Sequence, residues 1–294
     1  MAQSGGAPMM RRDALKALAA LAAVPTAAWA QEPGLQLGQG TAFDAQTVTN
    51  LARARAKTDY VARPKIPEAW RNLSYDQYRQ IWFDGRNALW EGTKTPQRLD
   101  VFPPGLYFPQ AVALHAVEDG VAHSIAFDMG VFDTTDQFPQ LPVDDTLGYS
   151  GLRLRAELEK PGVFQEYAVF QGASYFRGIG TGQNYGLSAR GLALKTGDPK
   201  GEEFPDFVAF WMETPAPGAA SIVIHALLDS PSCTGAYRFE VTPGEVLRMS
   251  VSAEIFAGDK LAASSVQQGY FADRETLRPI RIPQALQQKW LADR

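Results

Sequence analysis

The chain has 294 residues, a formal net charge of −4, 45% hydrophobic residues and 20% charged residues. This length suffices for one large domain or two small ones, and the negative charge gives no electrostatic support for a nucleic-acid partner. One cysteine, Cys233, excludes an intramolecular disulfide, and the 11% aromatic content with 26 glycines and 20 prolines favours a β protein rich in turns.

The sequence contains no recognisable metal-binding or nucleotide-binding motif. The three histidines, His115, His123 and His225, lack the spacing of metal ligands. The acidic stretch 133–145 lacks the residue order of an EF-hand, so a solvated loop is the better interpretation. The glycine run 178–182 lacks the strand and helix that flank a phosphate-binding loop. We therefore expect no metal site and no cofactor.

The N-terminus has the pattern of an export signal. Two adjacent arginines, Arg11 and Arg12, resemble the twin-arginine signal, and the alanine-rich run 17–28 leads to an Ala-Trp-Ala cleavage site. The pattern predicts a signal peptide over residues 1–30 and a periplasmic location. The run is too short and too weakly apolar for a stable membrane span, so we expect none in the mature chain. The alternative is an amphipathic first helix of the fold.

The mature chain begins with residues rich in glycine and glutamine. We expect residues 31–42 to be flexible. The stretch Phe43–Lys57 has helical character, and Phe43, Val48 and Leu51 can share one face of that helix.

A second helical stretch is predicted over Tyr75–Phe83. Its spacing places Tyr75, Tyr78, Ile81 and Trp82 on one face. A helix packed on the edge of a sheet is the simpler interpretation. An aromatic platform that faces a ligand is the alternative.

Strands and turns follow. Val112–Val117 and Ser124–Phe127 flank the turn residues Glu118-Asp119-Gly120, which predicts a hairpin. Leu152–Ala156 alternates apolar and charged residues as a half-buried strand does, and Phe164–Phe170 is a further strand candidate.

Residues 169–240 carry the densest mixture of aromatics, arginines, carboxylates and glycines, at strand-like spacing. Sugar rings have apolar faces, on which aromatic side chains stack, and hydroxyl rims, which bind carboxylates and guanidinium groups; a concave pocket with a few fixed polar groups suits them. The candidate carbohydrate-binding residues are Tyr175, Arg177, Tyr185, Arg190, Glu203, Asp206, Trp211 and Asp229.

Each candidate also has a structural interpretation. The aromatic residues can pack in the core, and Arg190 can form a surface ion pair with Glu203 or Asp206. Carboxylates of this stretch could act as acid and base in glycoside hydrolysis, but that chemistry needs a defined separation that sequence does not supply. We therefore assign no catalytic residue.

Five ordered motifs in this stretch resemble one family. The resemblance is to the periplasmic glucan biosynthesis protein G and D family (OpgG/OpgD, or MdoG), and it covers residues 43–257. The motifs are GASYFR at 172–177, YGLSARGLA at 185–193, EEFPDF at 202–207, ALLDS at 226–230 and TGAY at 234–237.

The resemblance implies a mainly β fold. The family has a large β-sandwich of the galactose-mutarotase type followed by an immunoglobulin-like domain, and it acts on osmoregulated periplasmic glucans with β-glucosidic backbones. Some members are similar to endo-β-1,2-glucanases that use paired acidic residues. Here we expect a partial sandwich over residues 43–257, preceded by a few short helices.

The chain departs from the family after residue 257. Residues 258–294 are predicted to form a divergent tail, and the immunoglobulin-like domain and the segment with the catalytic acids are expected to be absent. The resemblance then implies a protein that binds or shapes β-glucan during its synthesis, with membrane proteins of glucan synthesis as candidate partners. The alternatives are an endo-β-1,2-glucanase-type hydrolase and a truncated or frameshifted fragment without function.

Overall fold

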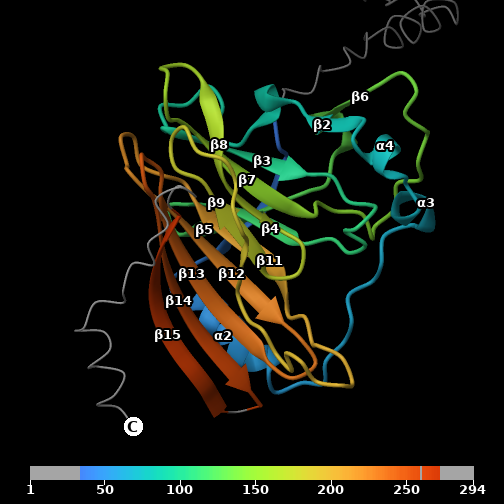
Figure 1. Cartoon of the computed structure of the whole chain (residues 1–294), viewed down its shortest axis with the longest axis vertical. Helices are drawn as coiled ribbons and strands as arrows, with labels where there is room; N and C mark the ends of the chain where they lie inside the picture. Colours follow the sequence, from blue (N-terminus) through green and yellow to red (C-terminus); the bar gives the residue numbers. More distant parts are fainter. Residues whose placement is uncertain (1–33, 259, 272–294) are drawn as a thin grey trace, which may run out of the picture. The chain divides into compact units, whose positions relative to one another are not determined.

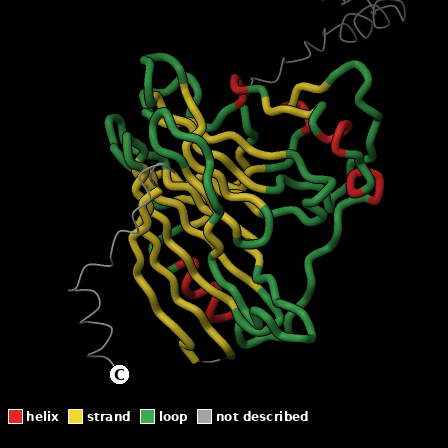
Figure 2. Tube along the Cα trace, viewed as in Figure 1, coloured by secondary structure: helices red, strands yellow, loops and turns green. Residues whose placement is uncertain are grey.

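The structure is a computed structural model that describes residues 34–258 and 260–271. The predicted signal peptide (1–30), with Arg11 and Arg12, lies outside the described residues. The described part is mainly β, with two facing sheets and few, short helices (Figures 1 and 2). The fold class predicted from the sequence is confirmed.

The larger sheet has eight strands in the order β1-β5-β4-β11-β12-β13-β14-β15. All neighbouring strands are antiparallel except β4 and β11, which are parallel. The parallel pair joins the strands of the N-terminal part to those of the C-terminal part. The strands are β1 (Leu37–Ala42), β4 (Ala113–Glu118), β5 (Val121–Ile125), β11 (Asp206–Glu213), β12 (Ile222–Asp229), β13 (Thr234–Thr242), β14 (Leu247–Ala257) and β15 (Lys260–Phe271).

The smaller sheet has five antiparallel strands in the order β10-β9-β8-β7-β3, and β2 pairs with β6 in a separate ribbon. The strands are β2 (Ile81–Phe83), β3 (Gln97–Phe102), β6 (Phe132–Thr134), β7 (Gly151–Glu157), β8 (Phe164–Gln171), β9 (Tyr175–Gly178) and β10 (Ala189–Arg190). The helices are α2 (Thr47–Arg55), α3 (Glu68–Arg71) and α4 (Tyr75–Tyr78), with 3₁₀ turns η1 (Gly85–Asn87) and η2 (Met129–Val131).

The main core lies between the two sheets. On β7 the alternation predicted from the sequence is confirmed: Leu152 and Leu154 are buried, while Arg153 and Arg155 face outward. Phe170 of β8 bridges the sheets, because its ring lies 5.8 Å from that of Phe210 and 5.1 Å from that of Phe239. This aromatic cluster holds the two sheets face to face.

A second, smaller core lies on the other face of the larger sheet, under α2. Figure 1 shows α2 against β12, β13 and β14. Val48 and Ala52 are buried there, whereas Leu51 is 43% exposed. The helix is confirmed, but the prediction that Leu51 lies on its packed face is wrong. Val48 and Ala52 are four residues apart and so share a face, and alanine allows α2 to lie close to the strands.

Two predictions near the N-terminus differ from the structure. Leu37–Ala42 was expected to be flexible but forms β1, because pairing with β5 uses backbone groups and needs no apolar side chains. The helix predicted over Tyr75–Phe83 ends at Tyr78, and Ile81–Phe83 forms β2. Ile-Trp-Phe favours a strand, so the four aromatic and apolar side chains share no face.

The hairpin prediction is confirmed by β4 and β5. Asp119 and Gly120 have φ of 49° and 75°, the left-handed geometry that a tight hairpin turn requires. At the other end, the divergent tail was predicted to begin at residue 258. Instead β15 continues the larger sheet by pairing with β14 as far as Phe271.

Candidate functional site

The predicted carbohydrate-binding residues fall into three places in the structure. Tyr175, Arg177 and Arg190 lie on β9 and β10 of the smaller sheet, and Tyr185 lies in the loop between these two strands. Glu203, Asp206 and Asp229 gather where β11 begins and β12 ends. Trp211 lies apart from both groups, on the α2 side of the larger sheet. The eight residues therefore separate into two groups and one packing position.

The outward face of the smaller sheet carries a network that we call the arginine face. It consists of Asp100, Arg153, Arg155, Glu166, Arg177 and Tyr185. Asp100 is fully buried at its centre. Arg153 Nε lies 2.7 Å from Asp100 Oδ2, and Arg155 Nη2 lies 2.8 Å from Oδ1. The register of β3 and β7 produces this contact, since Asp100 lies opposite Arg153.

The network continues across β8 and β9. Arg153 Nη1 lies 3.2 Å from Glu166 Oε2, and the Tyr185 hydroxyl donates a 2.5 Å hydrogen bond to Glu166 Oε1. The Arg177 guanidinium lies 4.5 Å from the centre of the Tyr185 ring. Burial raises the pKa of Tyr185, and the Glu166 carboxylate raises it further, so Tyr185 remains a hydrogen-bond donor at neutral pH.

Sequence reasoning found Arg177 and Tyr185 but missed the other four members of this network. Arg153 and Arg155 stand in the alternating stretch 152–156, whose pattern predicts only a half-buried strand. Asp100 and Glu166 had no signal of their own, because a carboxylate joins such a network only through the pairing of distant strands.

Arg190 and Tyr175 lie at the edge of the smaller sheet. They are register partners on β10 and β9, and the Arg190 guanidinium lies over the rings of Tyr175 and Phe204 at 5.7 Å and 5.0 Å. Arg190 forms its ion pair with Glu202. The expected partners Glu203 and Asp206 instead bind Lys195 and Arg63.

The second group lies at the ends of β11 and β12, where Asp206 and Asp229 are register partners. Arg63 Nη2 lies 2.9 Å from Asp206 Oδ2, and Arg55 Nε lies 2.6 Å from Asp229 Oδ2. Burial raises the pKa of Tyr60, and the charges of Asp229 and Asp206 raise it further. Arg55, at the end of α2, and Arg63, in the segment that follows, thus balance the two neighbouring carboxylates.

Glu203 holds the turn between β12 and β13. It accepts hydrogen bonds from the Ser232 amide at 2.9 Å, the Ser232 hydroxyl at 2.6 Å and Lys195 Nζ at 2.7 Å. Burial alone would raise the pKa of Glu203, but the hydrogen bonds from Lys195, Ser232 and Ser230 outweigh it and lower the pKa to about 2. A general acid near neutrality needs a raised pKa, so Glu203 is suited to structure and not to proton donation.

We expect Glu203→Gln to change the acid sensitivity of the protein. A carboxyl whose pKa falls on folding stabilises the fold above its unfolded pKa of about 4.3 and loses that effect as pH falls through the folded value. The folded value is about 2. The wild-type free energy of unfolding should therefore fall from pH 4.5 to 2 more steeply than that of the variant, as measured by urea unfolding. Parallel pH profiles would contradict this role, and Glu245→Gln serves as an exposed control.

Trp211 is a packing residue. It is 6% exposed, its ring is stacked 4.9 Å from that of His115, and Phe43 lies on it at 6.2 Å. A bulge in β11 between Phe207 and Ala209 directs Phe207 and Phe210 into the main core and Trp211 to the opposite face. A sugar cannot stack on Trp211 in this structure.

Residues 43–267 match the family described as "Periplasmic glucan biosynthesis protein, MdoG". The chain belongs to this family. The match extends past residue 257, where the resemblance was expected to stop, and so includes most of β15.

Several curated relatives share the description "Glucans biosynthesis protein G". The relative from Vibrio cholerae serotype O1 is 46% identical over 79% of this chain and 43% of its own length. The relative from Rhodopseudomonas palustris (strain BisA53) is 43% identical over 84% of this chain and 49% of its own length. The relative from Shewanella sp. (strain MR-4) is 45% identical over 73% of this chain and 39% of its own length. The chain thus spans somewhat less than half the length of these relatives.

None of the helices among the described residues has the length and apolar character that crossing a membrane requires. Nor do the described His, Cys, Asp and Glu side chains form a group of three or more that could hold a metal ion.

Proposed function

We propose that the chain binds β-glucan during periplasmic glucan biosynthesis and that the arginine face is its binding surface. The family and the names of the relatives support the process. The observation that supports this site is the fixed network of arginines, carboxylates and tyrosine on one face of the smaller sheet, with Arg177 exposed at its border.

The arrangement suits an uncharged sugar chain. Hydrogen bonds to Asp100 and Glu166 fix Arg153 and Arg155, so their remaining N–H groups are oriented before a ligand arrives. Tyr175, which is 37% exposed, supplies an aromatic surface at the edge of the same sheet. Neighbouring strands thereby combine charged donors, which bind sugar hydroxyls, with an aromatic ring, which stacks on the apolar face of a sugar.

The periplasm is the proposed site of action, as the family description states. The adjacent Arg11 and Arg12 support export by the twin-arginine route. Cell fractionation of the wild-type chain and of an Arg11→Lys, Arg12→Lys variant tests this proposal, since loss of the periplasmic fraction is expected only for the variant.

We expect Arg177→Ala to weaken binding of linear β-1,2-glucan by about tenfold, because a hydrogen bond to a charged group contributes about 1.5 kcal/mol or more. Affinity electrophoresis or calorimetry with the purified chain measures the change. Arg238→Ala is the matched control, because Arg238 is a half-exposed arginine of β13, ion-paired with Glu240, outside the arginine face. Equal affinity of wild type and Arg177→Ala would refute the assignment of the surface.

A further inference from the structure

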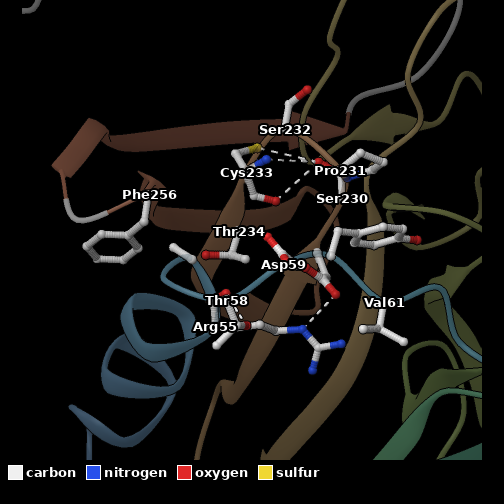
Figure 3. A pocket seen from close by; sticks show the side chains of 14 residues that line it. Arg55, Thr58, Asp59, Val61, Ser230, Pro231, Ser232, Cys233, Thr234 and Phe256 are labelled. Carbon is white, nitrogen blue, oxygen red and sulfur yellow. Dashed lines mark hydrogen bonds and ion pairs between the residues drawn. The ribbon is translucent and has the colours of Figure 1, made fainter.

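A cavity of about 370 Å³ lies beside Asp229 and shares no residue with the arginine face. Three parts of the chain line it: the end of α2 with the segment that follows, the turn between β12 and β13, and the ends of β13 and β14. Figure 3 shows Arg55 and Thr58 on one side of the cavity and Pro231 and Cys233 on the other. Its volume is in the range of small-molecule sites.

The fixed charges of the cavity come from Arg55, Asp59 and Asp229. Asp229 is 5% exposed and its charge is balanced by Arg55, whose side chain remains 39% exposed. Asp59 adds a second carboxylate to the lining. Because Arg55 is paired with Asp229, Asp59 leaves the lining with one excess negative charge, which disfavours an anionic ligand.

The remaining polar groups of the lining are uncharged. Burial raises the pKa of the Cys233 thiol, and the charges of Glu203 and Asp229 raise it further. Burial and the charges of Asp229 and Asp206 likewise raise the pKa of Tyr60, so its hydroxyl keeps its proton. The lining also holds four hydroxyl groups, each of which donates a hydrogen bond within the chain and so offers its oxygen to a ligand as an acceptor. They belong to Thr58, Ser230, Ser232 and Thr234. These groups suit hydroxyls of a neutral ligand.

Apolar side chains complete the lining. Ala56, Val61, Pro231 and Phe256 border the same cavity. A pocket with an apolar part and a few fixed polar groups matches a ring that has C–H faces and a hydroxyl rim. A fully apolar ligand would leave Asp229 and Arg55 without solvent or partners beyond each other, which is unfavourable.

From this geometry we propose that the cavity is a second saccharide site, which takes a neutral glycosyl unit. The choice of a neutral glucosyl unit rests on the proposed function, whereas the exclusion of anionic ligands and the match to hydroxyl groups follow from the lining. The chain then contacts glucan at two separate places, the arginine face and the cavity.

Cys233 provides a direct readout, because it lines the cavity and is the single cysteine of the chain. Alkylation by iodoacetamide, followed by intact-mass analysis, reports access to it. The probe is the disaccharide glucosyl-β-1,2-glucose. At ten times its Kd, we expect alkylation to slow about tenfold by mass action. Glucose 6-phosphate at the same concentration should leave the rate unchanged. No protection by the disaccharide, or equal protection by the phosphate, would overturn the proposal.

A variant that fills the cavity tests whether the disaccharide protects Cys233 by occupying the cavity or by binding elsewhere on the chain. Val61→Trp places a large side chain at an exposed position of the lining, and Val143→Trp is a matched control at an exposed position outside it. The measured quantity is the ratio of alkylation rates with and without disaccharide. Val61→Trp should bring this ratio close to one while Val143→Trp keeps the wild-type ratio. A wild-type ratio in both would overturn the proposal.

Arg177→Ala distinguishes this proposal from the proposed function. Loss of polymer binding with retained protection of Cys233 supports both sites. If the polymer binds through Arg177 but Cys233 is never protected, the cavity proposal fails alone. If Cys233 is protected and Arg177→Ala binds polymer as wild type does, the arginine face fails alone.

Discussion

Asp100→Asn is expected to lower the free energy of unfolding by about 3 kcal/mol, the lower end of what breaking a buried ion pair costs. Asp100 is fully buried, and Arg153 and Arg155 both bind it. Asparagine keeps the shape and one acceptor oxygen but removes the charge, so the two guanidinium groups lose the carboxylate that they share. Both arginines retain some exposure, and solvent screening keeps the effect at the lower end of the range.

The same substitution should weaken glucan binding. Arg153 and Arg155 would no longer be fixed before the ligand binds, so part of the binding energy would be lost in ordering them. Urea unfolding gives the stability and calorimetry gives the affinity. Asp136→Asn, in an exposed loop, is the matched control and should change neither. A stability loss below about 1 kcal/mol would show that solvent, and not Asp100, stabilises the two arginines.

Phe170→Ala is expected to destabilise the protein by about 3–5 kcal/mol, because it leaves a cavity between the two sheets. The ring of Phe170 contacts those of Phe176, Phe210 and Phe239, which belong to both sheets. The loss therefore affects the packing of one sheet on the other and not one strand alone.

Phe204→Ala is the matched control for this substitution. Phe204 is 51% exposed and contacts the Arg190 guanidinium, so its removal should cost about 1 kcal/mol or less. Thermal and urea unfolding of both variants give the comparison. Equal destabilisation by the two substitutions would show that the inter-sheet cluster is not the main source of stability.

Local patterns in the sequence were sufficient for those elements whose pairing partners are close along the chain. The hairpin of β4 and β5 follows from its turn residues, and β7 follows from its alternation. Where a short segment can form either a helix or a strand, its tertiary contacts determine which of the two forms. Ile81–Phe83 pairs with β6 instead of extending α4. Likewise, Leu51 is exposed because the strands under α2 accept the smaller Ala52.

The candidate site was only partly predictable. Motif spacing identified Arg177, Tyr185 and Asp229, but it could not show that they belong to different places. Asp100 contacts Arg153 only because β3 pairs with β7, and that register depends on strands separated by a long stretch of chain. Trp211 was misleading for a related reason: aromatic type is visible in a sequence, whereas the face on which it is buried is set by the bulge in β11.

The parallel pairing of β4 with β11 has a consequence for how the molecule folds. The strands β5 to β10, including most of the smaller sheet, lie between these two partners along the chain. The antiparallel run from β11 to β15 joins neighbours in sequence, so its loop-closure entropy is low and it can form early. Docking of the β4–β5 hairpin on β11 closes a longer loop, so we expect it to come later. Such non-local pairing is typical of folding in milliseconds to seconds, during which the edge of β11 is open to incorrect partners.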